Sequence, residues 1–212
     1  MSVVIVVGNP KPGSRTLQAA QLVTAALIGR DADLTLDLAA FGPRLLDWKD
    51  EVVAEAAAAV QAAALVVVAS PTYKATYTGL LKLFLDRFAA GSLAGTTTVP
   101  VMLGGDWRHS LAPEIFLKPV LAELGASSPT RGLFLLDSGA SSGWSDSDVL
   151  TNWLAVARTQ LPARLVAAGG TACQQVRRPT CRSRAGPGGV VRPDAFTHLM
   201  GCLIIRQYLV NQ

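Results

Sequence analysis

The sequence predicts an α/β fold in which helices cover both faces of a five-stranded parallel sheet. Short apolar runs alternate with longer segments of helical periodicity, and this alternation repeats five times along the chain. The first run is apolar almost throughout, as expected of a strand that lies between two helical layers. A length of 212 residues and a hydrophobic content of 50% fit one domain of ordinary size with a sizeable core.

The first half of the chain contains three predicted strands. Ser2–Gly8 is apolar and rich in β-branched residues, and the segment from Ser14 to about Ile28 follows it with helical spacing. Leu34–Leu38 alternates in polarity like a strand, and Lys49–Gln61 is an Ala-rich helix. Ala64–Ala69 is again a buried apolar strand.

The second half continues the same alternation. Apolar positions at helical spacing cover Thr78–Phe88, and Thr97–Leu103 is the fourth strand. A helix with two prolines is expected at Leu111–Leu124, and Gly132–Leu136 is the fifth strand. Asp146–Ala168 is the closing helix.

The order of the strands determines where such a sheet binds a ligand. Two orders fit the pattern, 2-1-3-4-5 and the order of dinucleotide-binding sheets. Both place ligands at the carboxyl ends of the strands, where the order reverses. In the order 2-1-3-4-5 this point lies between strands one and three, so we expect binding loops directly after Gly8 and Ala69.

Charge and composition disfavour several classes of protein. The net charge of +4 comes from the segment 171–193, which holds five arginines and no acid, while the rest of the chain has 14 basic and 15 acidic residues. We therefore expect no binding of nucleic acid. The three cysteines fit neither a disulfide framework nor a metal site. No apolar stretch reaches the roughly 18 residues of a membrane span. The N-terminal run predicts a core strand rather than a signal peptide, so the expected location is the cytoplasm.

The loop after the first strand suits a phosphate group. It leads from Gly8 to Thr16 into a helix, whose first N–H groups are free and carry partial positive charge. Ser14 and Thr16 add hydroxyl groups, and Lys11 and Arg15 add positive charge. The loop has neither the G-x-G-x-x-G nor the G-x-x-x-x-G-K-[ST] pattern, which disfavours a nucleotide triphosphatase. The alternative is a plain strand–helix turn in which Ser14 only caps the helix.

Two further loops suit a flat aromatic ligand. After the third strand, backbone amides of the segment Ser70–Lys82 can bond the polar edge of a ring, and Tyr73 or Tyr77 can cover its face. After the fourth strand, the pair Gly104–Gly105 lets a flat ligand approach the backbone closely, and His109 can reach it. The alternatives are turns without a ligand, with a tyrosine packed on the surface and His109 capping the next helix.

Together these segments resemble the NADPH-dependent FMN reductase family of the flavodoxin-like fold. They are most similar to the alkanesulfonate-linked flavin reductases of two-component monooxygenase systems. The resemblance is carried by GNPKPGSRT, SPTYKATYTGLLKLFLD and LGGDWRHSLAPEIFLKPVLAELGA, and it covers roughly residues 2–137. It implies a flavodoxin-like three-layer sandwich with the strand order 2-1-3-4-5. It also implies FMN with NADPH or NADH as cofactors, and a homodimer or homotetramer.

The resemblance assigns a role to each loop. The residues that match the family's phosphate loop are Asn9, Lys11, Ser14, Arg15 and Thr16. The residues that match the loop along the isoalloxazine ring are Pro71, Thr72, Tyr73 and Lys74. The residues that match the third loop, near the ring, are Gly104, Gly105 and His109. Hydride transfer between nicotinamide and flavin needs no acid–base pair, so no catalytic side chain and no metal ligand are assigned.

The chain departs from the family in two places. Ile115 stands where several sulfonate-linked members have an aromatic residue or histidine, which bears on how loosely flavin is held. From Gly169 to Pro193 the sequence is rich in Arg, Gly and Pro. We therefore predict a flavodoxin-like FMN-binding domain at 1–169 and a linker or loop at 170–193. The alternative for the linker is a basic arm that binds a partner or the 2′-phosphate of NADPH. An apolar segment at 194–212 is expected at a subunit interface or packed on its own domain.

The resemblance and the loops together predict an NAD(P)H-dependent FMN reductase. It supplies reduced flavin to a monooxygenase, or it reduces a small acceptor such as a quinone. Arg15 or Arg108 favours NADPH over NADH, since guanidinium suits a phosphate dianion. Two alternatives stay open: a non-enzymatic flavodoxin-like electron carrier or FMN-binding module, and a regulatory member that binds FMN without turnover.

Overall fold

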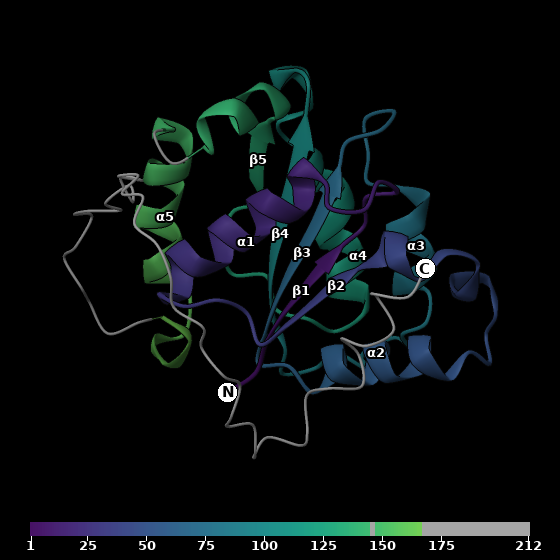
Figure 1. Cartoon of the computed structure of the whole chain (residues 1–212). Helices are drawn as coiled ribbons and strands as arrows, with labels where there is room; N and C mark the ends of the chain where they lie inside the picture. The colour runs from purple at the N-terminus through teal and green to yellow at the C-terminus, as the bar shows by residue number, and fades with distance from the viewer. Residues whose placement is uncertain (145–146, 167–212) are drawn as a thin grey trace, which may run out of the picture. The chain divides into compact units, whose positions relative to one another are not determined.

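The computed structural model describes residues 1–144 and 147–166 of the 212-residue chain. Five parallel strands form one sheet in the order β2-β1-β3-β4-β5 (Figure 1), which confirms the predicted fold class and strand order. This fold belongs to a unit that spans Met1–Gly169. The predicted linker at 170–193 and the apolar segment at 194–212 lie outside the described residues.

Strands and helices alternate along the chain. The strands are β1 Val3–Val7, β2 Leu34–Asp37, β3 Leu65–Pro71, β4 Thr97–Gly104 and β5 Leu133–Leu136. The α-helices are α1 Arg15–Ile28, α2 Glu51–Gln61, α3 Gly79–Leu85, α4 Lys118–Glu123 and α5 Asp148–Gln160. Short 3₁₀-helices occupy Leu38–Ala40, Gly42–Leu46, Trp107–His109, Asp137–Ser142 and Ala163–Leu165, and a π-helix occupies Pro113–Leu117.

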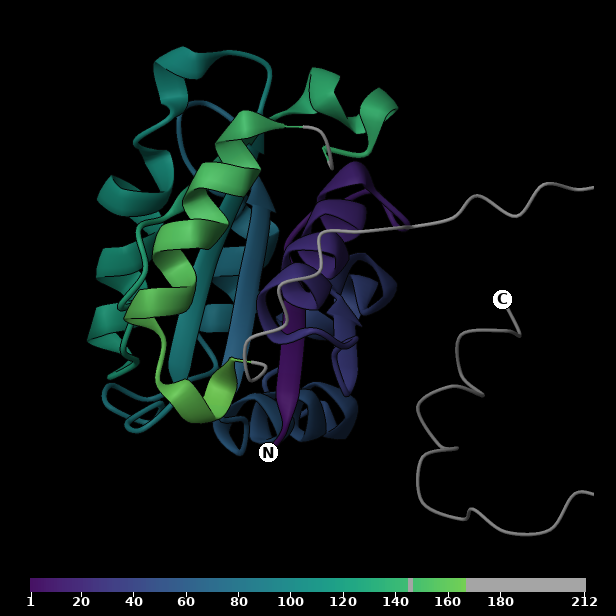
Figure 2. The ribbon, with the colours of Figure 1, turned by 90° about the vertical axis from the view of Figure 1, so that its left-hand side faces the viewer.

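The strands direct their side chains alternately into two apolar layers. Val4 and Val6 of β1 pack with residues of α2, α3 and α4, whereas Val3 and Ile5 pack with residues of α1 and α5. Figures 1 and 2 show these two helical layers on opposite faces of the sheet. Every residue of β1, β3 and β4 is buried, as a parallel sheet covered on both faces requires.

Strand β4 contains a proline although it lies inside the sheet. Proline has no N–H group for the ladder of hydrogen bonds and is therefore rare in central strands. Pro100 is level with Val68 of β3, but β5 pairs with β4 only from Val101 onward. The short strand β5 thus begins beyond the proline.

Indole groups bond the backbone just before β5 and at its last residue. Trp153 Nε1 of α5 donates a hydrogen bond to Arg131 O at 2.7 Å, just before the strand. Trp144 Nε1 donates to Leu136 O at 2.8 Å, at the last residue of the strand. The carbonyls of Arg131 and Leu136 are therefore satisfied within the chain.

The closing helix is shorter than the sequence predicts. It was expected to continue to Ala168, but α5 ends at Gln160. Leu161 adopts an extended backbone with φ −77° and ψ 145°. Pro162 is the reason, because a proline disfavours the helical conformation of the residue before it.

The fourth helical segment also differs from the prediction. The expected continuous helix at Leu111–Leu124 is a π-helix followed by the short helix α4. Lys118 N donates to Pro113 O, five residues back. Pro119 has no N–H to donate to the preceding turn, which weakens the α-helical ladder at this point. Likewise α3, expected at Thr78–Phe88, ends at Leu85.

None of the helices in the described part of the chain is both long and apolar enough to cross a membrane.

Candidate functional site

Three loops meet at the carboxyl ends of the central strands (Figure 1). They follow β1, β3 and β4, and β1 lies between β2 and β3, where the strand order reverses. The Thr78 hydroxyl donates to Gly8 O and links the first two loops. Thr72 N donates to Leu103 O at 2.6 Å and links the second loop to the strand that carries the third. All the predicted site residues therefore lie at the edge where a doubly wound sheet binds its ligands.

The loop after β1 has the donors of an anion-binding turn. Ser14 caps α1, and its Oγ accepts a hydrogen bond from Leu17 N at 3.3 Å. The N–H groups of Arg15 and Thr16 lie in the first turn, which has no intrahelical acceptors. Asn9, Ser14 and Thr16 are each at most 8% exposed. Asn9 Nδ2 donates to Thr16 Oγ1 at 2.9 Å. This set of buried polar groups at a helix N-terminus suits a phosphate.

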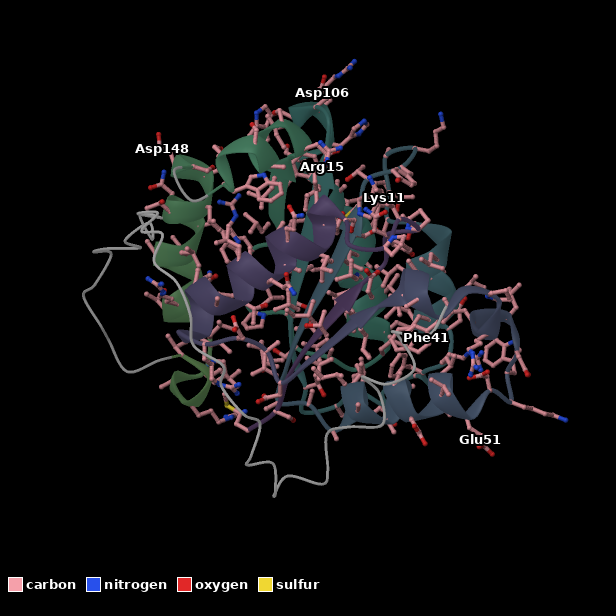
Figure 3. All side chains as sticks on the ribbon, viewed as in Figure 1. Lys11, Arg15, Phe41, Glu51, Asp106 and Asp148 are labelled. Atoms are coloured by element: carbon pink, nitrogen blue, oxygen red, sulfur yellow. The ribbon has the colours of Figure 1, made fainter. Side chains whose placement is uncertain are left out.

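The two cationic side chains of this loop lie at the surface (Figure 3). Lys11 N donates to Asn9 Oδ1 at 2.9 Å, which helps to shape the loop, while the Lys11 side chain is exposed. Arg15 Nη1 donates to Asp137 O at 3.3 Å, and Arg15 Nε lies 3.9 Å from Asp137 Oδ1. The Arg15 side chain is 58% exposed, so this ion pair stabilises the fold little. The guanidinium can therefore turn toward an anion in the loop.

A carboxylate without a predicted role also touches the first loop. Asp37 Oδ2, at the end of β2, accepts a hydrogen bond from Gly13 N at 3.0 Å. Gly13 has a φ of +62°, in the left-handed region that favours glycine. The sequence shows an aspartate at the end of a predicted strand, but only the parallel pairing of β2 with β1 brings it to the loop.

The loop after β3 contains a tight turn. Tyr73 N donates to Thr76 O at 2.9 Å, and Thr76 N donates to Tyr73 O at 3.3 Å. The two central residues, Lys74 and Ala75, have φ angles of +52° and +71°. Such angles cost a non-glycine residue about 1–2 kcal/mol, and strain of this kind is concentrated at functional sites. The turn presents Tyr73, which is 52% exposed, to solvent.

Two threonines of this segment have different surroundings. The Thr72 hydroxyl is buried and has no hydrogen-bond partner among the described residues. Thr78 caps α3 by accepting a hydrogen bond from Leu81 N at 3.1 Å, while its hydroxyl proton goes to Gly8 O. The capping role of Thr78 is visible in the sequence, but its link to a residue 70 positions earlier is not.

The loop after β4 is tightly packed at one glycine and open at the next. A Cβ at Gly104 would lie 2.7 Å from Phe134 Cζ, so packing excludes a side chain there. A Cβ at Gly105 would have no atom within 4 Å. His109 is half-buried, and the π-helix that follows has no side-chain cap, so His109 does not cap it. Gly105 thus leaves open space beside the loops.

The third loop also carries a local ion pair. Arg108 Nη2 lies 3.1 Å from Asp106 Oδ2, and Arg108 N donates to Asp106 Oδ1 at 2.8 Å. The backbone hydrogen bond, followed by the guanidinium, holds the pKa of the Asp106 carboxyl below its usual range, and the pair raises the pKa of Arg108. The Arg108 guanidinium is therefore paired with a carboxylate of its own loop. Within residues 1–144 and 147–166, no three His, Cys, Asp or Glu side chains form a cluster that could hold a metal ion.

The parallel sheet in the order β2-β1-β3-β4-β5, with its strand order reversing at β1, defines a protein of the flavodoxin-like fold. Over residues 1–141 the sequence matches the NADPH-dependent FMN reductase family. The chain belongs to this family.

Individual relatives agree with this assignment. The FMN reductase (NADPH) of Escherichia coli K12 is 32% identical over 142 residues, which are 65% of this chain and 74% of that protein. The NADH-dependent FMN reductase SfnF of Pseudomonas putida is 38% identical over 76 residues, 36% of this chain and 41% of that protein. Among solved structures, the apo form of the NADH:FMN oxidoreductase EMOB matches with a TM-score of 0.68 at 31% identity. The match covers 78% of this chain and 94% of that one.

Proposed function

We propose that this chain is an NAD(P)H-dependent FMN reductase that binds FMN across the three loops. The loop after β1 carries the proposal, because it gathers buried Asn9, Ser14 and Thr16 around the free N–H groups that begin α1. Membership of the FMN reductase family supports the choice of FMN as the phosphate-bearing ligand.

In this proposal the loop after β1 binds the flavin phosphate, and the loops after β3 and β4 bind the ring. The residues proposed to hold the phosphate are Asn9, Lys11, Ser14, Arg15 and Thr16. The residues proposed to lie along the ring are Pro71, Thr72, Tyr73 and Lys74, with Gly104, Gly105 and His109 near it. Two observations fit a ring at this place: the open space at Gly105 and the buried Thr72 hydroxyl, which has no partner among the described residues. A buried hydroxyl without a partner costs free energy, which a bound ligand can relieve.

Binding and orientation are the contributions of the protein. When bound, the flavin accepts a hydride from the nicotinamide, a reaction that needs no proton donor from the chain. The loop after β1 fixes one end of the ligand through its phosphate. Tyr73, held at the surface by the turn at Tyr73–Thr76, is available to cover a ring face. Gly105 adds no side chain that would obstruct the approach of a second flat ring.

The reduced flavin is proposed to pass to a flavin-dependent monooxygenase or to reduce a small acceptor such as a quinone. Ile115 bears on this choice because it replaces the aromatic residue or histidine of several sulfonate-linked relatives. It lies in the π-helix and is 55% exposed. Short π-helical turns are frequent at functional sites.

A homodimer or homotetramer is part of the same proposal. A groove of about 420 Å³ lies between α3 and α4, and its lining combines apolar Leu85, Phe88, Val120 and Leu124 with charged Lys82, Asp86 and Glu123. Such a face is suited to a second subunit. Mass photometry or sedimentation of the full chain measures the oligomer.

The deciding experiment is an anaerobic absorbance titration of the purified protein with FMN and then NADPH or NADH. Loss of the flavin band at about 450 nm, at a rate proportional to the enzyme concentration, is the expected result. Binding of FMN without loss of the band would identify an electron carrier or a regulatory protein. Absence of FMN binding would contradict the assignment of all three loops.

A further inference from the structure

The carboxylate of Asp37 lies beside the loop proposed for the flavin phosphate. Strands β1 and β2 are parallel neighbours, and Asp37 is level with Val7, so the end of β2 brings this carboxylate to the loop that starts at Gly8. Asp37 Oδ2 accepts a hydrogen bond from Gly13 N at 3.0 Å, and Oδ1 accepts one from Ala39 N at 3.4 Å.

The hydrogen bond from Gly13 fixes the direction in which the chain enters α1. Gly13 precedes the capping residue Ser14 and has a φ of +62°. A Cβ at Gly13 would have no atom within 4 Å, so the space on that side of the residue is open. The Asp37 carboxylate is the acceptor for the Gly13 N–H. The N–H groups of Arg15 and Thr16, which begin α1, follow within three residues of this bond.

The same carboxylate places a negative charge next to the proposed anion site. Within the described part of the chain no cation forms an ion pair with Asp37, and Arg15 lies instead with Asp137. Like charges in one site destabilise each other. Asp37 therefore acts on a bound phosphate in two opposite ways: its hydrogen bond shapes the loop, and its charge repels the ligand.

We propose that Asp37 is a positioning residue that holds the phosphate loop in its binding shape and, through its charge, limits the affinity for FMN. A reductase whose flavin leaves as a product needs a limit on its affinity for FMN. This inference rests on the proposed function and deepens it, because it names the group that balances retention against release.

Two substitutions separate the hydrogen bond from the charge. Asp37→Asn removes the negative charge and keeps one side-chain oxygen, which can accept from Gly13 N at the expense of the longer bond from Ala39 N. We expect its dissociation constant for FMN to fall about fivefold, as one charge is removed at a distance of several ångströms. Asp37→Ala removes both the charge and the acceptor, so its dissociation constant is expected to be about tenfold higher than that of Asp37→Asn.

Fluorescence titration with FMN and with riboflavin measures these constants. Riboflavin lacks the phosphate, so its affinity is expected to be the same in the wild type and in both variants. The gain in Asp37→Asn is also expected to shrink at high salt, because ions screen the charge. The matched control is Glu51→Gln, which removes one negative charge at the start of α2, well away from Lys11 and Arg15 (Figure 3). It should leave both affinities unchanged.

The outcomes distinguish this inference from the function on which it rests. Unchanged FMN affinity in Asp37→Asn, or an equal gain for riboflavin, overturns the role of Asp37 while the phosphate loop stands. A wild-type protein that binds FMN no more tightly than riboflavin overturns the phosphate loop, and the role of Asp37 with it. Circular dichroism establishes that each variant is folded. If Asp37→Ala does not fold, the near-isosteric Asp37→Asn decides alone.

Discussion

Arg15 can pair either with Asp137 or, in the proposed complex, with the flavin phosphate. In this structure it donates to the Asp137 backbone carbonyl and lies near the Asp137 carboxylate. In the proposed complex it turns to the flavin phosphate. The exposed ion pair is weak, whereas a hydrogen bond between guanidinium and phosphate in a cradle of N–H groups is strong. Arg15 is thus suited to close over a ligand after the ligand has bound.

Replacing Arg15 by alanine is expected to weaken FMN binding about tenfold, because one charge-assisted hydrogen bond is lost. Riboflavin affinity should not change, since riboflavin has no phosphate. Arg15→Lys keeps the charge without the planar fork and should fall between the wild type and the alanine variant. Fluorescence titration measures all three. An alanine variant with wild-type affinity for FMN would remove Arg15 from the site.

The residue types of the site can be predicted from the sequence, but their pairings cannot. Ser14 before an apolar helix signals a cap, and the structure shows that cap. The contacts of Gly13 with Asp37 and of Arg15 with Asp137 join residues 24 and 122 positions apart. They depend on which strands lie side by side, which no local pattern contains.

At the scale of the elements, the end of β4 is fitted closely to β5. Gly104 is buried, and a Cβ there would lie 2.7 Å from Phe134 Cζ and 3.4 Å from Thr72 Cβ. The absence of a side chain lets the second and third loops come together.

We therefore expect Gly104→Ala to lower the free energy of unfolding by about 1–3 kcal/mol, because the added methyl group overpacks this contact. A second change, Phe134→Leu, should recover part of the loss by making room. Urea unfolding followed by circular dichroism measures both.

Gly105→Ala is the matched control for Gly104→Ala. Its added Cβ meets no atom within 4 Å, so the expected change in stability is small. Equal losses in the two alanine variants would show that backbone conformation, and not the contact with Phe134, determines the effect.

The strands were more predictable than the helices for a physical reason. A strand buried on both faces is an uninterrupted run of apolar residues, so β1 and β3 are evident in the sequence. Helix ends depend on single residues and on competing hydrogen bonds. Pro162 ends α5 early. In the fourth helical segment, Lys118 N donates to the carbonyl five residues back, so the expected helix is a π-helix followed by α4.

At the scale of the whole molecule, one carboxylate ties the start of the chain to the beginning of β2. Asp33 Oδ2 accepts a hydrogen bond from Val3 N at 2.7 Å, and Asp33 forms an ion pair with Arg30 at 2.9 Å. The hydrogen bond from Arg30, followed by that from Val3, lowers the pKa of Asp33. Because the folded chain binds this proton less readily than the unfolded chain, Asp33 stabilises the fold above about pH 4, its unfolded pKa, and loses that contribution as the pH falls further.

Asp33→Asn is accordingly expected to reduce stability at pH 7 and to reduce it less at pH 3. Urea unfolding at both values measures the two differences. Asp31→Asn is the matched control, an exposed carboxylate of the same connection without an ion pair among the described residues. A difference between wild type and Asp33→Asn that does not depend on pH would contradict the role of the charge.

The two indoles at β5 have a consequence beyond this molecule's own folding. An open edge strand can act as a template on which a strand of another chain adds, and repetition of that step yields fibrils. Trp153 and Trp144 already donate to the carbonyls of Arg131, before β5, and of Leu136, its last residue. The strand itself has four residues, and short edge strands are one way in which proteins limit pairing with another chain. The two indole bonds thus reduce the backbone that is free at β5 to pair with a strand of another copy.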